Sequence, residues 1–295
     1  MSDEKPLRVA TFYESRLGRN DGSPLYYTHA MRQLGIEVVH LSSQYPPDDF
    51  GKFDAYLWVD WGEDGLTNIL PFKPISLKDY HPSLYVTSDT HLGFDYRLQK
   101  AREFDNVFCN QKRAVEEFKE AGVVAKWLPH AVEPMAYPAE PEAIKKYDIG
   151  FVGFVTFPKR VDMLDTLFKA FPNFWFGQKL FEEAAAIYRQ SRIVFNTACV
   201  DDVNMRVFEV LATKSFLLTE WVPTLDELFI DGVHLVTYKT MDEAIEKAKY
   251  YLEHEDEREK IAEAGYKLTM ELHTYKQRIL KAFSECGLKI GGANG

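Results

Sequence analysis

An arginine and a glutamate within residues 201–219 are spaced in a way that suits a nucleotide. Arg206 and Glu209 are three residues apart, and apolar residues recur around them at the spacing of a helix beginning near Asn204. A cation in the first helical turn can neutralise phosphate, and a carboxylate one turn later can bind ribose hydroxyls. The free N–H groups of a helix N-terminus also attract phosphate. The spacing equally permits a surface helix in which Arg206 and Glu209 form an ion pair.

Two further cations follow a strand-like segment, residues 149–155, and precede a predicted helix. Lys159 and Arg160 would lie beside the N-terminus of that helix, where an anion is already favoured. Gly153 would let the backbone come close to a ligand. Together with Arg206, the two residues favour a diphosphate site, although basic residues on a loop are often simply solvated.

An aspartate and a histidine follow another buried strand, residues 84–87. Asp89 and His91 could act as acid and base, or could contact a sugar and its leaving phosphate. Alternatively, Asp89 caps the next helix and His91 is a polar residue satisfied within a cleft wall. His130 follows a further apolar stretch, and we expect a structural role for it more than a catalytic one.

Near the N-terminus, a loop with Arg19, Asp21 and Gly22 precedes a helix. It does not match the GxGxxG pattern of dinucleotide-binding proteins, and it lacks the Lys and Ser/Thr of a P-loop. The chain also has no GxSxG elbow and no HExxH motif, which lowers the expectation of a serine hydrolase or zincin.

Composition narrows the class of protein. The chain has 295 residues, of which 46% are hydrophobic and 27% charged, with a formal net charge of -10. This balance predicts a globular protein and argues against a broad nucleic-acid-binding surface, though not against a local basic patch. The three cysteines are far apart, so we expect neither a disulfide framework nor a structural zinc site. The start lacks an apolar secretory segment, and no apolar run approaches the ~20 residues of a membrane span, so a cytoplasmic protein is expected.

The elements that must position these residues alternate between strand-like and helix-like segments. This pattern predicts an α/β protein with two doubly wound, Rossmann-like domains facing a central cleft. The proline-rich, charged composition of residues 133–146 predicts the linker between the two domains. We therefore expect an N-terminal domain at residues 1–140, a second domain at 141–289 and a tail at 290–295. We expect the C-terminal helices to pack across the two domains, with the last helix returning to the first domain.

Together these residues resemble a glycosyltransferase of the GT-B fold. The closer similarity is to the bacterial and phage group 1 glycosyltransferases, which include the CgeB-like spore-maturation proteins. It covers most of the chain, and residues 14–80 contribute least to it. The segments that carry it are residues 87–93, 127–131, 147–153, 158–160, 204–212, 216–219, 225–232 and 273–275.

This resemblance implies a nucleoside-diphosphate sugar donor, foremost a UDP-sugar, held mainly by the second domain. Glu209 would bind the ribose, and Arg160 with Lys159 or Arg206 would neutralise the diphosphate. Retaining relatives carry a further glutamate eight positions before that one, at the sugar contact. This chain departs from the pattern, because Asp201 stands there, with Asp202 adjacent. The implied donor-binding residues are Gly153, Lys159, Arg160, Asp201, Asp202, Asn204, Arg206 and Glu209.

The same resemblance implies transfer without a bound metal or permanent cofactor. The acceptor would face the N-terminal domain, with Arg19, Asp21 and Gly22 on its side. If the enzyme inverts, Asp89 or His91 is the expected base; a retaining enzyme requires none. The acceptor could be a saccharide, a protein, a small molecule or a modified DNA base. Two alternatives remain open, namely a nucleotide-sugar epimerase of the same fold and a nonenzymatic nucleotide-binding module.

Overall fold

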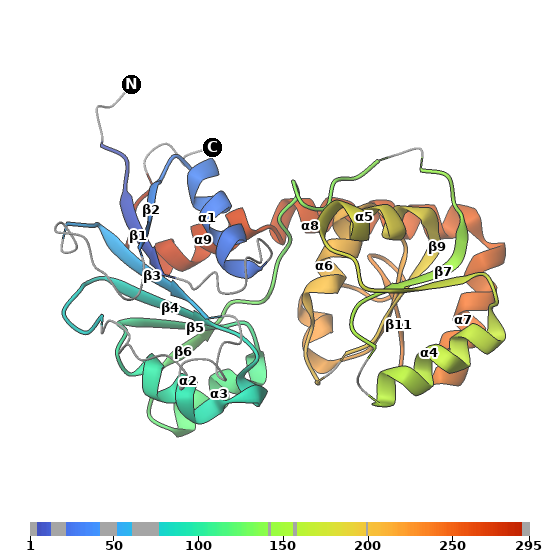
Figure 1. The fold of residues 1–295 in the computed structure, drawn as a ribbon, viewed down its shortest axis with the longest axis horizontal. Helices are drawn as coiled ribbons and strands as arrows, with labels where there is room; N and C mark the ends of the chain where they lie inside the picture. Colours follow the sequence, from blue (N-terminus) through green and yellow to red (C-terminus); the bar gives the residue numbers. More distant parts are fainter. Residues whose placement is uncertain are drawn as a thin grey trace. The chain divides into compact units, whose positions relative to one another are not determined.

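The chain forms two compact units (Figure 1). The computed structural model describes residues 5–12, 22–41, 52–60, 77–140, 143–155, 158–198 and 200–290. The first unit comprises Met1–Pro129 and Tyr275–Gly295, and the second comprises His130–Thr274. The last helix, α9 (Tyr275–Glu285), therefore belongs with the first unit although it follows the second in sequence.

The first unit is built on a six-stranded parallel sheet with the order β2-β1-β3-β4-β5-β6. Every residue of β3 and β4 is buried, which explains why both strands are nearly continuous apolar runs. Helices α1 and α9 lie on one side of this sheet, and α2 and α3 lie on the other (Figure 1). The strands are β1 (Arg8–Phe12), β2 (Glu37–Leu41), β3 (Ala55–Val59), β4 (Ser83–Thr87), β5 (Asn106–Cys109) and β6 (Ala125–Trp127), and the remaining helices are α1 (Ser23–Gln33), the short η2 (Thr90–Leu92), α2 (Phe94–Ala101) and α3 (Lys112–Glu120).

The second unit has a five-stranded parallel sheet with the order β11-β10-β9-β7-β8. From β7 the chain runs first to β8 on one side and then to β9 on the other. Helices α4 and α7 cover one face of this sheet, and α5 and α6 cover the opposite face (Figure 1). The elements are β7 (Tyr147–Val152), α4 (Pro158–Ala170), β8 (Phe174–Gly177), α5 (Phe181–Gln190), β9 (Ser191–Asn196), α6 (Met205–Ala212), β10 (Leu217–Glu220), the short η3 (Pro223–Glu227), β11 (Val236–Tyr238), α7 (Met241–Glu253) and α8 (Glu255–Leu272).

The predicted α/β alternation with two Rossmann-like domains is confirmed. Both sheets are entirely parallel, and each has its own buried apolar core. The expected helix start near Asn204 is also confirmed, because Asn204 is the residue that precedes the first turn of α6.

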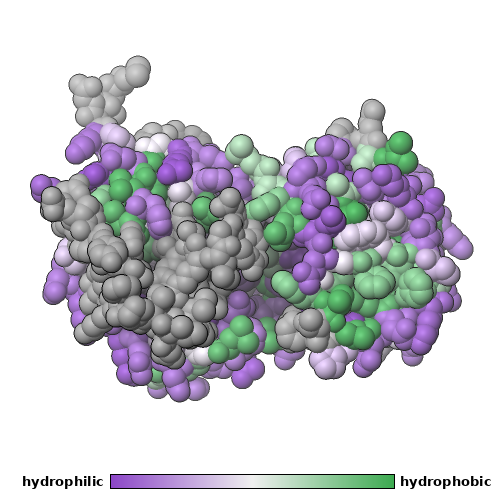
Figure 2. Space-filling view, viewed as in Figure 1, coloured by the Kyte–Doolittle hydropathy of each residue, from purple (hydrophilic) through white to green (hydrophobic). Residues whose placement is uncertain are grey.

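Polar side chains dominate the face seen in Figure 2, and apolar side chains gather over part of the second unit. The exposed large apolar residues include Phe154 after β7, Phe168 on α4 and Phe176 on β8. Among the described helices none is long and apolar enough to cross a membrane.

Candidate functional site

The strand order of the second unit creates a topological switch point between β7 and β9. Successive connections leave this point in opposite directions, and in open α/β sheets such a point is where a ligand-binding crevice is expected, at the carboxyl ends of the strands. Gly153 follows β7, Asn196 ends β9, and the N-terminus of α6 begins eight residues after Thr197. The predicted residues of the second unit therefore converge where ligands bind in open α/β sheets.

Arg206 is fixed at this switch point by three neighbours. Its Nη1 donates a hydrogen bond to Asn196 Oδ1 across 2.7 Å. Its guanidinium carbon lies 4.7 Å from the centre of the Phe151 ring, a cation–π distance. A side-chain methyl group at Gly153 would overlap Arg206 Nη2. The glycine thus makes room for the guanidinium at the end of β7.

We expect Gly153→Ala to weaken nucleotide binding, because the added methyl group displaces the Arg206 guanidinium. The backbone φ of +155° adds strain for any L side chain. The matched control is Gly232→Ala, where φ is +72° but nothing lies within 4 Å of the added carbon. Calorimetric titration with UDP checks this, and equal losses of affinity in both variants would contradict it.

Glu209 lies one turn after Arg206 and contacts α5. Its Oε2 accepts a hydrogen bond from the Tyr188 hydroxyl across 3.2 Å. Burial raises the pKa of Glu209, while attraction to Arg206 and hydrogen bonds from Tyr137 and Tyr188 oppose that rise. Among the contacts of these described residues no direct Arg206–Glu209 ion pair is formed, so a simple surface pair does not explain the spacing.

The raised pKa of Glu209 predicts a stability cost at neutral pH. Its folded-state pKa exceeds the unfolded value, so the protonated form favours folding and that stability is lost as pH rises through the folded pKa. We therefore expect Glu209→Gln to raise the thermal midpoint at pH 7.5, with the gain fading as pH falls toward about 4.5. The exposed control Glu246→Gln should show no such pH-dependent gain. A Glu209→Gln midpoint at or below wild type at pH 7.5 would contradict the prediction.

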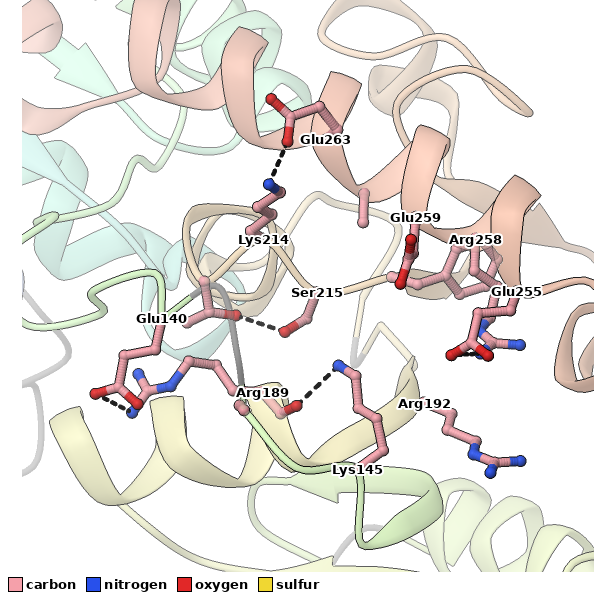
Figure 3. Close-up of a pocket in the computed structure, with 14 residues that line it drawn as sticks. Glu140, Lys145, Arg189, Arg192, Lys214, Ser215, Glu255, Arg258, Glu259 and Glu263 are labelled. Carbon is pink, nitrogen blue, oxygen red and sulfur yellow. Dashed lines mark hydrogen bonds and ion pairs between the residues drawn. The ribbon is translucent and has the colours of Figure 1, made fainter.

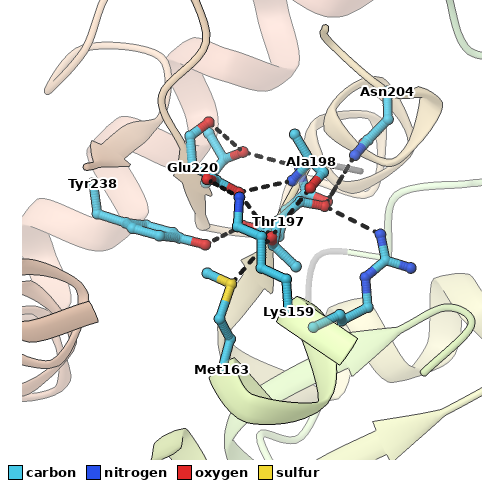
Figure 4. A network of polar contacts seen from close by, with 10 residues as sticks. Lys159, Met163, Thr197, Ala198, Asn204, Glu220 and Tyr238 are labelled. Carbon is cyan, nitrogen blue, oxygen red and sulfur yellow. Dashed lines mark hydrogen bonds and ion pairs between the residues drawn. The ribbon is translucent and has the colours of Figure 1, made fainter. Parts of the chain in front are cut away.

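Lys159 is engaged by a carboxylate in the present structure. Its Nζ lies 2.6 Å from Glu220 Oε1, at the end of β10 (Figure 4). The other oxygen of Glu220 accepts hydrogen bonds from Thr197 Oγ1 across 2.8 Å and from the Ala198 N–H across 3.2 Å. Glu220 was not identified by the sequence analysis, because it is 61 residues from Lys159 and meets it only in the folded unit.

Arg160 is buried and binds the loops themselves. Its exposed fraction is 5%. Nη1 donates to the Phe154 carbonyl across 2.7 Å, and Nη2 donates to the Thr197 carbonyl across 3.4 Å. These bonds tie together the loops that follow β7 and β9. Arg160 therefore holds these two loops together, whereas the Arg206 guanidinium lies at the ends of β7 and β9.

The remaining predicted donor-binding residues lie on the loop between β9 and α6. Asn204 does not cap α6 with its side chain; its Nδ2 donates instead to Asn196 Oδ1 and to the Thr197 carbonyl, each across 3.3 Å. Asp202 Oδ1 accepts from the Val203 N–H across 2.9 Å, and Asp201 is exposed. Asn204 therefore joins the Arg206 network, whereas Asp201 is exposed on the same loop.

In the first unit, Asp89 and His91 occupy a short, well-anchored loop after β4. Asp89 has a left-handed backbone, with φ 49°, and precedes η2; its side chain makes no capping bond there. The Thr90 N–H and hydroxyl both donate to Gln111 Oε1 across 2.7 Å. His91 is exposed. The loop thus presents both residues from a fixed backbone.

A buried ion pair that the sequence analysis did not identify supports this loop. Arg97 is 0% exposed, and its Nε lies 3.3 Å from Asp60 Oδ2, at the end of β3. Arg97 also donates to the Ser88 carbonyl across 2.7 Å and to the Gly93 carbonyl across 3.2 Å. One guanidinium therefore holds both ends of the loop that carries Asp89 and His91. In the sequence, only Asp60, an acidic residue directly after a buried apolar strand, could have indicated this pair.

The predicted acceptor-side residues are only partly described. Gly22 precedes α1, and its carbonyl accepts from the Leu25 N–H across 3.1 Å. Arg19 and Asp21 lie outside the described residues. His130 is half-buried at the start of the second unit.

A cavity of about 370 Å³ lies at the opposite, amino end of the second sheet (Figure 3). Its cations are committed to the protein: Lys145 Nζ donates to the Arg189 carbonyl across 2.8 Å at the end of α5, and Lys214 lies 2.5 Å from Glu263. Arg258 binds the carbonyls of Tyr251 and Leu252 near the end of α7. These contacts are those of helix ends and ion pairs within the protein. Because the cavity lies at the amino ends of the strands, it is separate from the switch-point site at their carboxyl ends.

No group of three or more potential metal ligands occurs among the described residues.

Comparisons with known proteins bear on the fold and on the class of the second unit. Residues 165–284 match the family model described as glycosyl transferase-like. This match includes α6, with Arg206 and Glu209, and β10, with Glu220. No curated protein sequence matches the chain.

Three solved structures illustrate the similarity in fold. Anabaena HepE, solved with UDP and glucose, is 12% identical, with a TM-score of 0.63 over 95% of this chain and 100% of that chain. An alpha-glucosyltransferase bound to UDP and a 13-mer DNA containing an HMU base is 11% identical, with a TM-score of 0.63 over 95% and 98%. T4 phage BGT with UDP-glucose is 13% identical, with a TM-score of 0.61 over 95% and 99%. The chain thus has the GT-B fold, and its residues 165–284 match the glycosyl transferase-like family model.

Proposed function

We propose that the protein is a glycosyltransferase that moves a sugar from a nucleoside-diphosphate sugar to an acceptor, without a bound metal. UDP is the proposed nucleotide, because HepE, T4 phage BGT and the alpha-glucosyltransferase were all solved with UDP or UDP-glucose. The match over residues 165–284 supports the same class of reaction. The finer affiliation that we propose is with the CgeB-like group.

One observation carries this proposal, namely the placement of Arg206 and Glu209 on one face of α6 at the switch point. The Arg206 guanidinium lies at the ends of β7 and β9, beside the N-terminus of α6. Glu209 follows by about one helical turn of 5.4 Å. We assign the diphosphate to Arg206 and the helix N-terminus, and the ribose hydroxyls to Glu209.

The proposed chemistry is electrostatic stabilisation of a departing diphosphate. The bond between the sugar's anomeric carbon and the β-phosphate oxygen breaks as the acceptor oxygen bonds to that carbon. Arg206, Lys159 and the helix dipole offset the negative charge that develops on the leaving group, which is the task a metal ion performs in other transferases. If the reaction inverts, Asp89 or His91 takes the acceptor's proton.

The acceptor remains open among a saccharide, a protein, a small molecule and a modified DNA base. The last is supported by one structural neighbour that binds DNA containing an HMU base. The net charge of -10 opposes broad DNA binding, so any nucleic acid would be held by a local patch.

A ligand screen tests the proposal. Thermal shifts should be larger with UDP and UDP-sugars than with ADP or GDP, and calorimetry should then give one bound nucleotide per chain. With a suitable acceptor, UDP release should match the formation of a glycoside. Failure of UDP, GDP and ADP alike to bind would overturn the assignment, and binding without turnover across an acceptor panel would favour a nonenzymatic module.

A further inference from the structure

The Glu220 carboxylate is held in one orientation at the mouth of the proposed donor site. Its side chain is 18% exposed at the carboxyl end of β10, directly beside β9. Oε2 accepts two hydrogen bonds, from Thr197 Oγ1 and from the Ala198 N–H. Oε1 contacts Lys159 Nζ (Figure 4). Thr197 directly follows Asn196, which binds Arg206, so Glu220 belongs to the same network.

The partner of Oε1 is the exchangeable part of this network. The Lys159 side chain is 63% exposed, whereas Thr197 is 1% exposed. A lysine on a flexible stem can turn toward a stronger anion, and a diphosphate carries more charge than one carboxylate. Thr197 and the Ala198 N–H would then keep Glu220 in place with Oε1 left as an open acceptor.

The other carboxylate to consider is Asp201, at the position suggested by the resemblance for a sugar contact. Asp201 is exposed on the loop before α6, and Asn204, which follows it closely, turns its side chain back toward Asn196. Glu220 is partly buried and oriented by two donors, which is the condition for a preorganised hydrogen-bond acceptor.

We propose that Glu220 is the residue that binds the hydroxyl groups of the transferred sugar, released for this role when the donor's diphosphate draws Lys159 away. This inference rests on the proposed function. The carboxylate would accept charge-assisted hydrogen bonds from one hydroxyl group of a hexose or from two neighbouring ones. Glu220 thereby determines which donor sugar the enzyme accepts, while Arg206 and Glu209 recognise the nucleotide.

The test compares the affinity for UDP with that for UDP-sugars in Glu220→Gln. UDP-glucose, UDP-galactose and UDP-N-acetylglucosamine are titrated into wild type, and the sugar with the largest gain over UDP is taken forward. In Glu220→Gln this gain should fall about tenfold, the value of one charged hydrogen bond. Affinity for UDP itself should stay the same or increase, because Lys159 no longer faces a carboxylate.

Two further variants separate the effect of Glu220 from that of losing any carboxylate and from poor folding. Glu246→Gln removes an exposed carboxylate on α7 and should change neither affinity. Lys159→Met should weaken UDP binding while the gain from the sugar persists, and this variant retains Glu220 if Glu220→Gln proves poorly folded.

Several results would overturn the inference. These are an undiminished sugar gain in Glu220→Gln, a gain lost only in Asp201→Asn, or a wild type that binds UDP yet gains nothing from any sugar. Each leaves the proposed function standing. A wild type that binds no nucleoside diphosphate overturns the proposed function itself.

Discussion

Arg206→Met is expected to weaken UDP binding by at least about tenfold. The guanidinium lies between Asn196 Oδ1, the Phe151 ring and Gly153, where the N-terminus of α6 also favours an anion. A hydrogen bond to a charged group contributes about 1.5–3 kcal/mol, so losing the phosphate contacts should weaken binding about 10- to 100-fold or more. Isothermal titration with UDP measures the loss.

The matched control for this variant is Arg192→Met. Arg192 belongs to the same unit, is 47% exposed and lies 3.7 Å from Asp148, near the cavity at the amino ends of the strands. It should retain wild-type affinity. Arg206→Lys should recover part of the binding, because it keeps the charge without the planar fork of donors. Wild-type UDP affinity in Arg206→Met would remove Arg206 from the site.

Arg97→Met should destabilise the first unit by about 3–5 kcal/mol, because it removes the guanidinium that lies 3.3 Å from the buried Asp60 carboxylate. Asp60 would keep the hydrogen bond from the Tyr85 hydroxyl, across 2.8 Å to Oδ2, and its attraction to Lys100. The substitution also removes the bonds that hold the Ser88 and Gly93 carbonyls. Urea unfolding followed by circular dichroism measures the free energy.

A second substitution separates lost charge pairing from lost packing. Asp60→Asn combined with Arg97→Met should recover much of the stability, since the amide is neutral and still accepts the Tyr85 hydrogen bond. The exposed control Arg113→Met breaks an ion pair with Glu117 on α3, where Arg113 is 82% exposed, and should cost at most about 0.5 kcal/mol. If Arg97→Met and Arg113→Met unfold alike, the Asp60–Arg97 pair does not support the first unit as described.

Local patterns were enough to predict the framework and the face of α6. The alternation of short apolar runs with helical periodicity indicates parallel strands covered on both sides, and Arg206 and Glu209 share a face because helical geometry requires it. These features depend on neighbours within a few residues of each other. The switch point follows from strand order and locates α6 at the ends of β7 and β9.

Partners distant in sequence could not be predicted in the same way. Lys159 meets Glu220 only because β10 lies beside β9, and Arg160 binds a carbonyl 37 residues away. Both residues looked equally available for phosphate in the sequence. Arg97 gave no signal at all, because an arginine on a polar helix is ordinarily exposed, and only the contact with Asp60 explains its burial.

The central claim is that a nucleoside diphosphate binds at the carboxyl ends of β7 and β9, and a crystal structure with UDP-glucose tests it most directly. We predict the diphosphate within hydrogen-bond distance of Arg206 and the α6 N-terminus, with the ribose hydroxyls on Glu209. A nucleotide bound instead in the cavity beside Lys145 and Arg258, with Arg206 and Glu209 making no contact to it, would contradict the claim.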